Sequence, residues 1–201
     1  MGVSCHKMSK QDKIKWNQRY SEGAYSERVN PSPFLQYCIK NSKYSYTIEL
    51  GSGLGRNTKY LSARSSHIDA IDISSVAIEK AKIEHESIRN INWINADLEN
   101  FQGITFNKYD LVVSIRYLNK NLLAHITNEL KPGGEIVIEE HLVTDQSVIG
   151  PNNPSFRVRP KEVYLINQKL KCLFYSENII FDPDGRKVAL VQCHYKKTNQ
   201  L

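Results

Sequence analysis

The sequence predicts an α/β fold whose central sheet has seven strands and is mostly parallel. Five short runs of strand-forming residues alternate with segments of helical length, and they lie at 46–50, 67–73, 91–94, 109–115 and 135–140. Two further runs, at 172–181 and 187–195, are joined by Asp182-Pro183-Asp184-Gly185, a sequence typical of a tight turn. Alternating strands and helices favour a parallel sheet covered on both faces, and the final pair predicts an antiparallel hairpin that closes it.

Length and composition predict one domain. A chain of 201 residues with 40% hydrophobic content can bury one substantial core and leaves little room for a second. We therefore expect a single domain over residues 1–201, made of N-terminal helices (1–45), a central unit (46–140) and a C-terminal loop, helix and hairpin (141–201).

The sequence also predicts a cytoplasmic protein without a metal site. Its four cysteines are widely scattered, and none has the spacing of a zinc site or a redox pair. No apolar run approaches the roughly 18 residues of a membrane span, and the N-terminus lacks the apolar core of a secretory signal. We expect no association with a membrane.

The net charge is +6, from 27 Lys and Arg against 21 Asp and Glu. Such an excess is compatible with binding to nucleic acid, to an acidic metabolite or to an anionic membrane. The basic residues are spread along the whole chain, however, whereas nucleic-acid binding is indicated by basic residues gathered on one face. Charge alone therefore does not favour a nucleic-acid partner.

The N-terminal region predicts two helices. Residues 9–22 place Ile14 and Trp16 among polar residues, which suggests a short amphipathic helix. Ser32 followed by Pro33 is a favourable cap and first position for a second helix, which we expect to end near residue 41.

The C-terminal third begins with a long irregular segment. Residues 141–159 contain glycine, proline and asparagine without a helical or alternating period. Loops of this length are usually functional covers or disordered. Pro160 then predicts the start of a helix in which Val163, Ile166 and Leu170 share one face.

The most informative stretch is 47–56, where a strand-like run ends in Gly51, Gly53 and Gly55 before a helix. Backbone without a Cβ can bend sharply and approach a ligand closely. A dinucleotide-binding turn would need another glycine at the sixth position of this loop, where the chain has Arg56. The mismatch argues against a dinucleotide, and a glycine-rich turn without a ligand remains an alternative.

Asp72 ends the second strand-like run about 20 residues beyond the glycines. A carboxylate at this position can accept hydrogen bonds from the two hydroxyls of a ribose. The alternative is that Asp72 caps the helix that follows, although Ser74 and Ser75 are better placed for capping.

Glu49 and the three glycines resemble the first motif of the class I S-adenosylmethionine-dependent methyltransferases, which is an acidic residue, a spacer and Gly-x-Gly-x-Gly. The resemblance implies a Rossmann-like sheet with S-adenosylmethionine as cofactor. It also implies that the turn holds the methionine and ribose part, with Glu49 near the amino group. Asp97, in a segment similar to the adenine-binding motif, would meet the exocyclic amine. Residues 109–114 and 131–135 resemble the later motifs of the family in the expected order.

Residues 15–20 and 30–35 are similar to the N-terminal region of the small tellurite-resistance-type and thiopurine-methyltransferase-like enzymes. There an aromatic residue and an arginine fold over the cofactor, which implies such roles for Trp16 and Arg19, with the Arg19 fork on the cofactor carboxylate. Alternatively, Trp16 packs on the sheet as core material. In all, the resemblance implies cofactor contacts by Trp16, Arg19, Glu49, Gly51, Ser52, Gly53, Gly55, Asn57, Asp72, Ile73, Asp97, Leu98 and Ser114.

The family builds the floor of its acceptor pocket after the fourth strand. Enzymes that methylate base amines often carry an Asn or Asp, two prolines and an aromatic residue there, whereas this chain has Ser114, Ile115, Arg116 and Tyr117. Base-amine methylation is therefore disfavoured. Arg116 could bind an anionic acceptor or be a surface residue that caps the strand end. The other catalytic candidates are Tyr117 and His141, and His141 is a possible base because it follows the fifth strand.

The resulting expectation is an S-adenosylmethionine-dependent methyltransferase that acts on a small molecule by direct in-line transfer. One alternative is an RNA or protein methyltransferase that uses the basic excess, including Arg157 and Arg159, to hold a larger partner. Another is a non-catalytic module that binds the cofactor, because a fold does not fix an activity.

Overall fold

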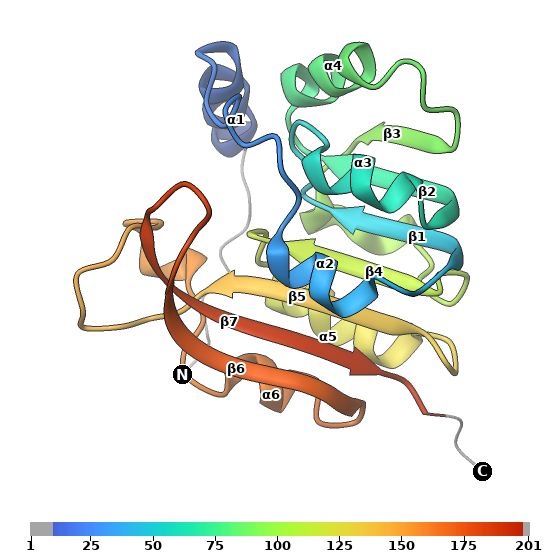
Figure 1. Ribbon diagram of the computed structural model, residues 1–201, viewed down its shortest axis with the longest axis vertical. Coiled ribbons are helices and arrows are strands. Elements are labelled where there is room, and N and C mark those ends of the chain that lie inside the picture. Colours follow the sequence, from blue (N-terminus) through green and yellow to red (C-terminus); the bar gives the residue numbers. More distant parts are fainter. Residues whose placement is uncertain (1–9, 199–201) are drawn as a thin grey trace.

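A seven-stranded sheet forms the centre of the computed structural model, which describes residues 10–198 (Figure 1). The strand order is β3-β2-β1-β4-β5-β7-β6; β5–β7 and β6–β7 pair antiparallel and the other neighbours are parallel. The strands are β1 (Tyr44–Leu50), β2 (Ser65–Asp72), β3 (Ile91–Asn95), β4 (Leu111–Ile115), β5 (Glu135–His141), β6 (Lys171–Phe181) and β7 (Lys187–Lys196). The predicted fold class and the closing hairpin are confirmed.

Helices cover both faces of the sheet (Figure 1). The α-helices are α1 (Lys10–Ser21), α2 (Pro33–Ile39), α3 (Arg56–Ser62), α4 (Ser75–Glu84), α5 (Lys120–Glu129) and α6 (Glu162–Ile166), with 3-10 helices η1 (Leu98–Gly103) and η2 (Pro154–Phe156). Residues 1–9 and 199–201 of the predicted domain lie outside the described residues.

The core is divided in two by the sheet, because successive side chains of a strand point to opposite faces. Leu111 and Val113 of β4 pack with α2 and α3, whereas Val112 between them packs with α5 and α6. All five residues of β4 are buried, as expected for a central parallel strand. The sheet is thus a rigid platform whose parallel strands end at one edge.

The N-terminal helices begin and end close to the predicted positions. α1 starts at Lys10, and Ser32 caps α2, with its hydroxyl accepting from the backbone N–H of Leu35. The predicted helix after Pro160 is shorter than expected, because α6 ends at Ile166 and leaves Leu170 beyond it. The Asn167 side chain terminates it by donating to the Val163 carbonyl and accepting from Thr127 of α5.

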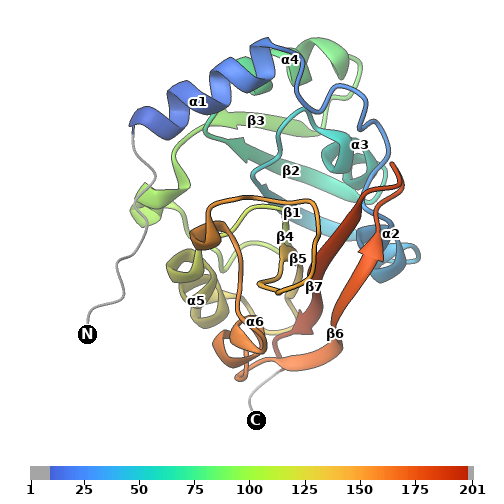
Figure 2. The same ribbon diagram turned by 90° about the vertical axis from the view of Figure 1, so that its left-hand side faces the viewer.

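Figure 2 looks toward the carboxyl edge of the parallel strands and shows α1 next to α4. The segment between β5 and α6 crosses in front of this edge in Figure 2 and lies beside it in Figure 1. Within residues 10–198, none of the helices has the length and apolar character that crossing a membrane requires.

Candidate active site

A cavity of about 610 Å³ opens at the carboxyl edge, next to the point where the strand order reverses between β1 and β4. Ligands of open α/β sheets bind at such a switch point, and the volume is within the range of small-molecule sites. Its walls come from α1, the turn after β1, the ends of β2, β4 and β5, residues 149–153 and the β6–β7 turn.

The glycine turn brings backbone close to the floor of the cavity. Gly51 and Gly53 have φ of +70° and +55°, in the left-handed region that favours glycine. A Cβ on Gly51 would lie 2.6 Å from the Tyr117 Cβ, and one on Gly53 would lie 2.8 Å from the Tyr20 hydroxyl oxygen. Ser52 lines the cavity between them, whereas Gly55 heads α3 and faces Trp93.

Asp72 ties this turn to the end of β2. Its side chain is 7% exposed; Oδ2 accepts from the Gly53 N–H and Oδ1 from the Ser74 N–H, both at 2.8 Å. Burial raises the pKa of Asp72, while the two N–H donors oppose the rise. Each carboxylate oxygen has a further lone pair for a ligand, and the capping alternative is wrong because Ser74 is the N-cap of α4.

Glu49 lies beneath the cavity and does not line it. The carboxylate is 1% exposed and accepts from Asn57 Nδ2 at 3.1 Å and from the Thr58 hydroxyl. It therefore anchors the first turn of α3, and the expected direct contact with a cofactor amino group is not supported. Asn57 does line the cavity, and its Oδ1 accepts from the Ser32 N–H at 2.8 Å.

The wall near β3 is mainly apolar. Ile73, Ala96 and Leu98 line the cavity, as a flat aromatic base would need. Asp97 does not line it, and its Oδ1 accepts from the Glu99 N–H at 2.9 Å at the start of η1. The predicted position of the adenine is compatible with this wall, but the Asp97 carboxylate is engaged by the backbone.

α1 forms an aromatic cover over the cavity. The ring of Trp16 lies 6.0 Å from that of Tyr20 and 6.4 Å from that of Tyr25, and the Arg19 guanidinium carbon lies 5.1 Å from the Trp16 centroid. Trp16 and Arg19 both line the cavity, so the alternative in which Trp16 packs on the sheet is not supported. Ser74 donates to Asn17 at 2.8 Å and thereby fastens α1 to α4.

Arg116 is held by acidic neighbours at the other end of the cavity. Nε donates to Glu139 at 3.1 Å and Nη2 to Asp182 in the β6–β7 turn at 2.8 Å, with the side chain 14% exposed. The alternative of a surface residue that caps the strand end is therefore wrong. Ser114 does not line this cavity, and its hydroxyl donates to the Tyr117 carbonyl at 2.8 Å.

His141 lines the cavity but is a poor candidate for a base. Burial, and then the nearby Arg116 and Arg157 cations, lower the pKa of His141 to about 3. A neutral imidazole with so low a pKa accepts a proton weakly at pH 7. The prediction of His141 as a general base is therefore not supported by its surroundings.

Sequence reasoning missed Glu140, which lines the cavity and is 2% exposed. Burial raises the pKa of Glu140 well above its usual value. The sequence did contain a signal for it, because Glu139 and Glu140 are adjacent near the end of an otherwise apolar strand. Successive side chains of a strand point to opposite faces, so the two acids lie on opposite sides of the sheet.

The cavity has a cationic lining overall. Among the described residues that line it, Lys and Arg number six and Asp and Glu number four. The six are Lys15, Arg19, Arg28, Arg56, Arg116 and Arg186. Such a lining favours an anionic ligand. Over residues 10–198, no cluster of three His, Cys, Asp or Glu side chains could hold a metal.

Comparison with known proteins identifies the family. A model described as a methyltransferase domain matches residues 48–134. Malonyl-[acyl-carrier protein] O-methyltransferase 2 of Ilyobacter polytropus is 33% identical over 196 residues, which cover 88% of this chain and 68% of that protein. The chain belongs to the class I S-adenosylmethionine-dependent methyltransferases. S-adenosylmethionine is accordingly its cofactor.

Other methyltransferases share shorter regions with the chain. Phosphoethanolamine N-methyltransferase 1 of Triticum aestivum is 36% identical over 102 residues, covering 46% of this chain and 20% of that protein. Trans-aconitate 2-methyltransferase of Deinococcus radiodurans is 26% identical over 129 residues, covering 62% and 48%. The chain thus spans between 20% and 68% of the length of these three relatives.

Solved structures agree on the fold. TehB of Haemophilus influenzae has a TM-score of 0.70 at 23% identity, covering 90% of this chain and 67% of its own. The N-methyltransferase NodS of Bradyrhizobium japonicum WM9, in complex with S-adenosyl-L-homocysteine, has a TM-score of 0.63 at 18% identity, covering 85% and 90%. The resemblance to tellurite-resistance-type methyltransferases is confirmed for the fold.

The side chains of this methyltransferase fit the cofactor. A glycine turn that lines the cavity without room for a Cβ at Gly51 or Gly53, a buried carboxyl group beside it and an apolar wall toward β3 are compatible with a ribose and its attached base. Arg19 has a guanidinium that faces the cavity from α1 and could meet a carboxylate.

Gly53→Val should abolish binding of S-adenosylhomocysteine, because its side chain would enter the cradle against Tyr20. Gly133→Val is a matched control, since Gly133 has φ of +80° but nothing within 4 Å of a Cβ. Calorimetric titration should show binding by the control and none by Gly53→Val. Equal affinities in the two variants would contradict the position assigned to the cofactor.

Glu49→Gln should change how stability depends on pH. Burial raises the pKa of Glu49 from 4.5 to about 7, so its stabilising contribution is complete below pH 4.5 and is lost as the pH rises through 7. The free energy of unfolding of Glu49→Gln relative to the wild type should therefore increase, by about 3 kcal/mol between pH 4 and pH 8.

Urea unfolding across this pH range measures the difference between the two proteins. Glu162→Gln is a control of opposite sign, because hydrogen bonds from Lys120 and from the Arg159 N–H lower the pKa of Glu162. The free energy of unfolding of Glu162→Gln relative to the wild type should decrease as the pH rises. A pH-independent difference for Glu49→Gln would show that Glu49 is not buried in the folded protein.

Proposed function

We propose that this protein transfers a methyl group from S-adenosylmethionine to a small molecule that carries a carboxylate. The observation that carries the proposal is the continuity of one cavity from the glycine turn and Asp72 to the ends of β4 and β5 and the β6–β7 turn. The first end fits a nucleoside, and the cavity as a whole, with six Lys and Arg against four Asp and Glu in its lining, favours an anion.

Two of the relatives support the same class of acceptor. Their names give malonyl-[acyl-carrier protein] and trans-aconitate as the molecules methylated, and both carry carboxylates. A carboxylate is already ionised at pH 7 and needs no general base. This requirement agrees with a site in which His141 is a weak base.

The cofactor supplies a methyl group on a sulfonium, so that a new oxygen–carbon bond forms as the sulfur–carbon bond breaks and its electron pair stays on sulfur. The chain contributes position and exclusion of water. The glycine turn and Asp72 fix one reactant, and α1, residues 149–153 and the β6–β7 turn enclose the other.

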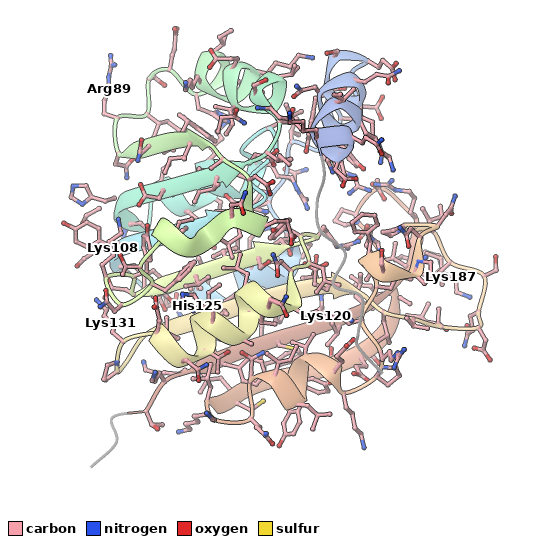
Figure 3. All side chains as sticks on the ribbon, turned by 180° about the vertical axis from the view of Figure 1, so that it is seen from behind. Arg89, Lys108, Lys120, His125, Lys131 and Lys187 are labelled. Carbon is pink, nitrogen blue, oxygen red and sulfur yellow. The ribbon has the colours of Figure 1, made fainter. Side chains whose placement is uncertain are left out.

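A large RNA partner is less well supported. Lys108 and Lys131, labelled in Figure 3, lie near each other at one edge of the back face, and Lys120 lies apart from them; each forms an ion pair with an acidic residue. Arg157 donates to the backbone carbonyls of Leu142 and Pro151 and so holds the loop beside the cavity. These cations are engaged within the protein and do not form one phosphate-binding surface.

The proposal is tested by incubating the protein with methyl-labelled cofactor and, in separate reactions, malonate, trans-aconitate, neutral dimethyl malonate or a ribosomal RNA fragment. Label should enter one of the free acids and neither the diester nor the RNA. Transfer to RNA alone would overturn the small-molecule proposal. Binding of the cofactor without transfer to any acceptor in a wider metabolite panel would favour the non-catalytic module.

A further inference from the structure

Three residues at the β5 end of the cavity carry a buried polar atom without a hydrogen-bond partner. In the part of the chain that the structure describes, these atoms are the Tyr117 hydroxyl, Glu140 Oε1 and His141 Nδ1, and all three residues line the cavity. Glu140 is 2% exposed. An unmet buried polar group is unfavourable, so three of them at one wall, two of which carry oxygen, indicate that a ligand supplies a missing partner.

Tyr117 and Glu140 lie beyond the cofactor end of the cavity. Tyr117 packs against Gly51, since a Cβ there would lie 3.0 Å from the tyrosine Cγ, and so it marks the edge of the glycine cradle. β4 and β5 lie on the opposite side of β1 from β2, which carries Asp72. Tyr117 and Glu140 therefore face the half of the cavity left for the methyl acceptor.

Neighbouring charges do not satisfy Glu140. Arg116 directs its Nε and Nη2 donors to Glu139 and Asp182. The backbone N–H groups of Tyr117 and His141 favour the charged form of Glu140, but burial outweighs them and raises its pKa. Burial also raises the pKa of Tyr117. Burial therefore favours the protonated, neutral form of both groups.

A trapped water is a weaker explanation for the pair. The void behind Tyr117 and Glu140 measures about 10 Å³ and is walled mainly by apolar side chains such as Leu122 and Ile138. This volume is at the lower limit for one water, and a buried water needs several polar partners. The missing partner is therefore expected on the side of the main cavity.

We propose that the Tyr117 hydroxyl and the protonated Glu140 carboxyl bind the carboxylate of the methyl acceptor as a pair of neutral donors. The inference rests on the proposed function and names the groups that orient its acceptor. Neutral donors hold a carboxylate without neutralising its charge, whereas a bidentate arginine would neutralise the charge and engage both oxygens. One acceptor oxygen is held and the other uses a lone pair to form the bond to the methyl carbon, while Tyr117 and Glu140 keep their protons.

Three variants test the pair, with malonate as the probe. Malonate is titrated into the complex with S-adenosylhomocysteine, and KM and kcat for malonate are measured in parallel. Tyr117→Phe should weaken malonate binding about tenfold and raise KM, because one donor is lost. Tyr195→Phe is the matched control, since the Tyr195 hydroxyl is likewise buried without a hydrogen-bond partner but Tyr195 does not line the cavity, and the variant should bind malonate normally.

Glu140→Gln tests whether residue 140 acts as a neutral donor or as a charged carboxylate, because the amide keeps an N–H donor at every pH. It should bind malonate like the wild type at pH 7. As the pH rises through the raised pKa of Glu140, the wild type should lose affinity for malonate, while Glu140→Gln should retain it. The charged or titratable groups that face Glu140 are Arg116, Glu139, Tyr117 and His141, and they are the same in both proteins.

The results distinguish the inference from the function on which it rests. Loss of malonate binding in Glu140→Gln at pH 7, or unchanged binding in Tyr117→Phe, would overturn the donor pair. Failure of the wild-type complex to bind malonate, together with methyl transfer to another acceptor, would overturn the pair and leave the methyltransferase function intact. No binding of S-adenosylhomocysteine at all would overturn the proposed function itself.

Discussion

The geometry of the site depends on the Asp72 carboxylate, which accepts the Gly53 N–H from the glycine turn after β1 and the Ser74 N–H from the turn after β2. These two bonds place a buried carboxyl group at the point where two adjacent strands end. Both turns are held by one side chain, and its remaining lone pairs leave it able to accept hydrogen bonds from a vicinal diol. The ribose contact proposed for Asp72 would therefore use the same carboxyl group that fixes the local backbone.

Glu139 fixes several parts of the chain at the other end of the cavity, as Asp72 does at the first. It accepts from Arg116 after β4, from Gln192 of β7 at 2.7 Å and from Ser32 before α2 at 3.4 Å. Arg116 in turn reaches Asp182 in the β6–β7 turn. The wall of the acceptor half is thus fixed to four separate parts of the chain, and Glu140, the next residue on β5, is left facing the cavity without a charged partner.

Local patterns predicted most of the fold, because strand runs, the Ser32 cap and the glycine turn depend on neighbours in sequence. The site was predicted where one residue type fits one conformation, as at Gly53. Features that depend on residues far apart in the sequence were missed. Arg116 and Asp182 are 66 residues apart, and the end of α6 depends on a contact from Asn167 to Thr127. Glu49 was misplaced because a motif gives its position on β1 but not the polar residues of α3 that surround it.

A crystal structure with S-adenosylhomocysteine tests the central claim most directly. We expect both ribose hydroxyls within hydrogen-bonding distance of Asp72, the base against Leu98 and the sulfur near Gly51 and Tyr117. A ligand bound elsewhere, or bound here with its ribose away from Asp72, would contradict the role given to this carboxylate.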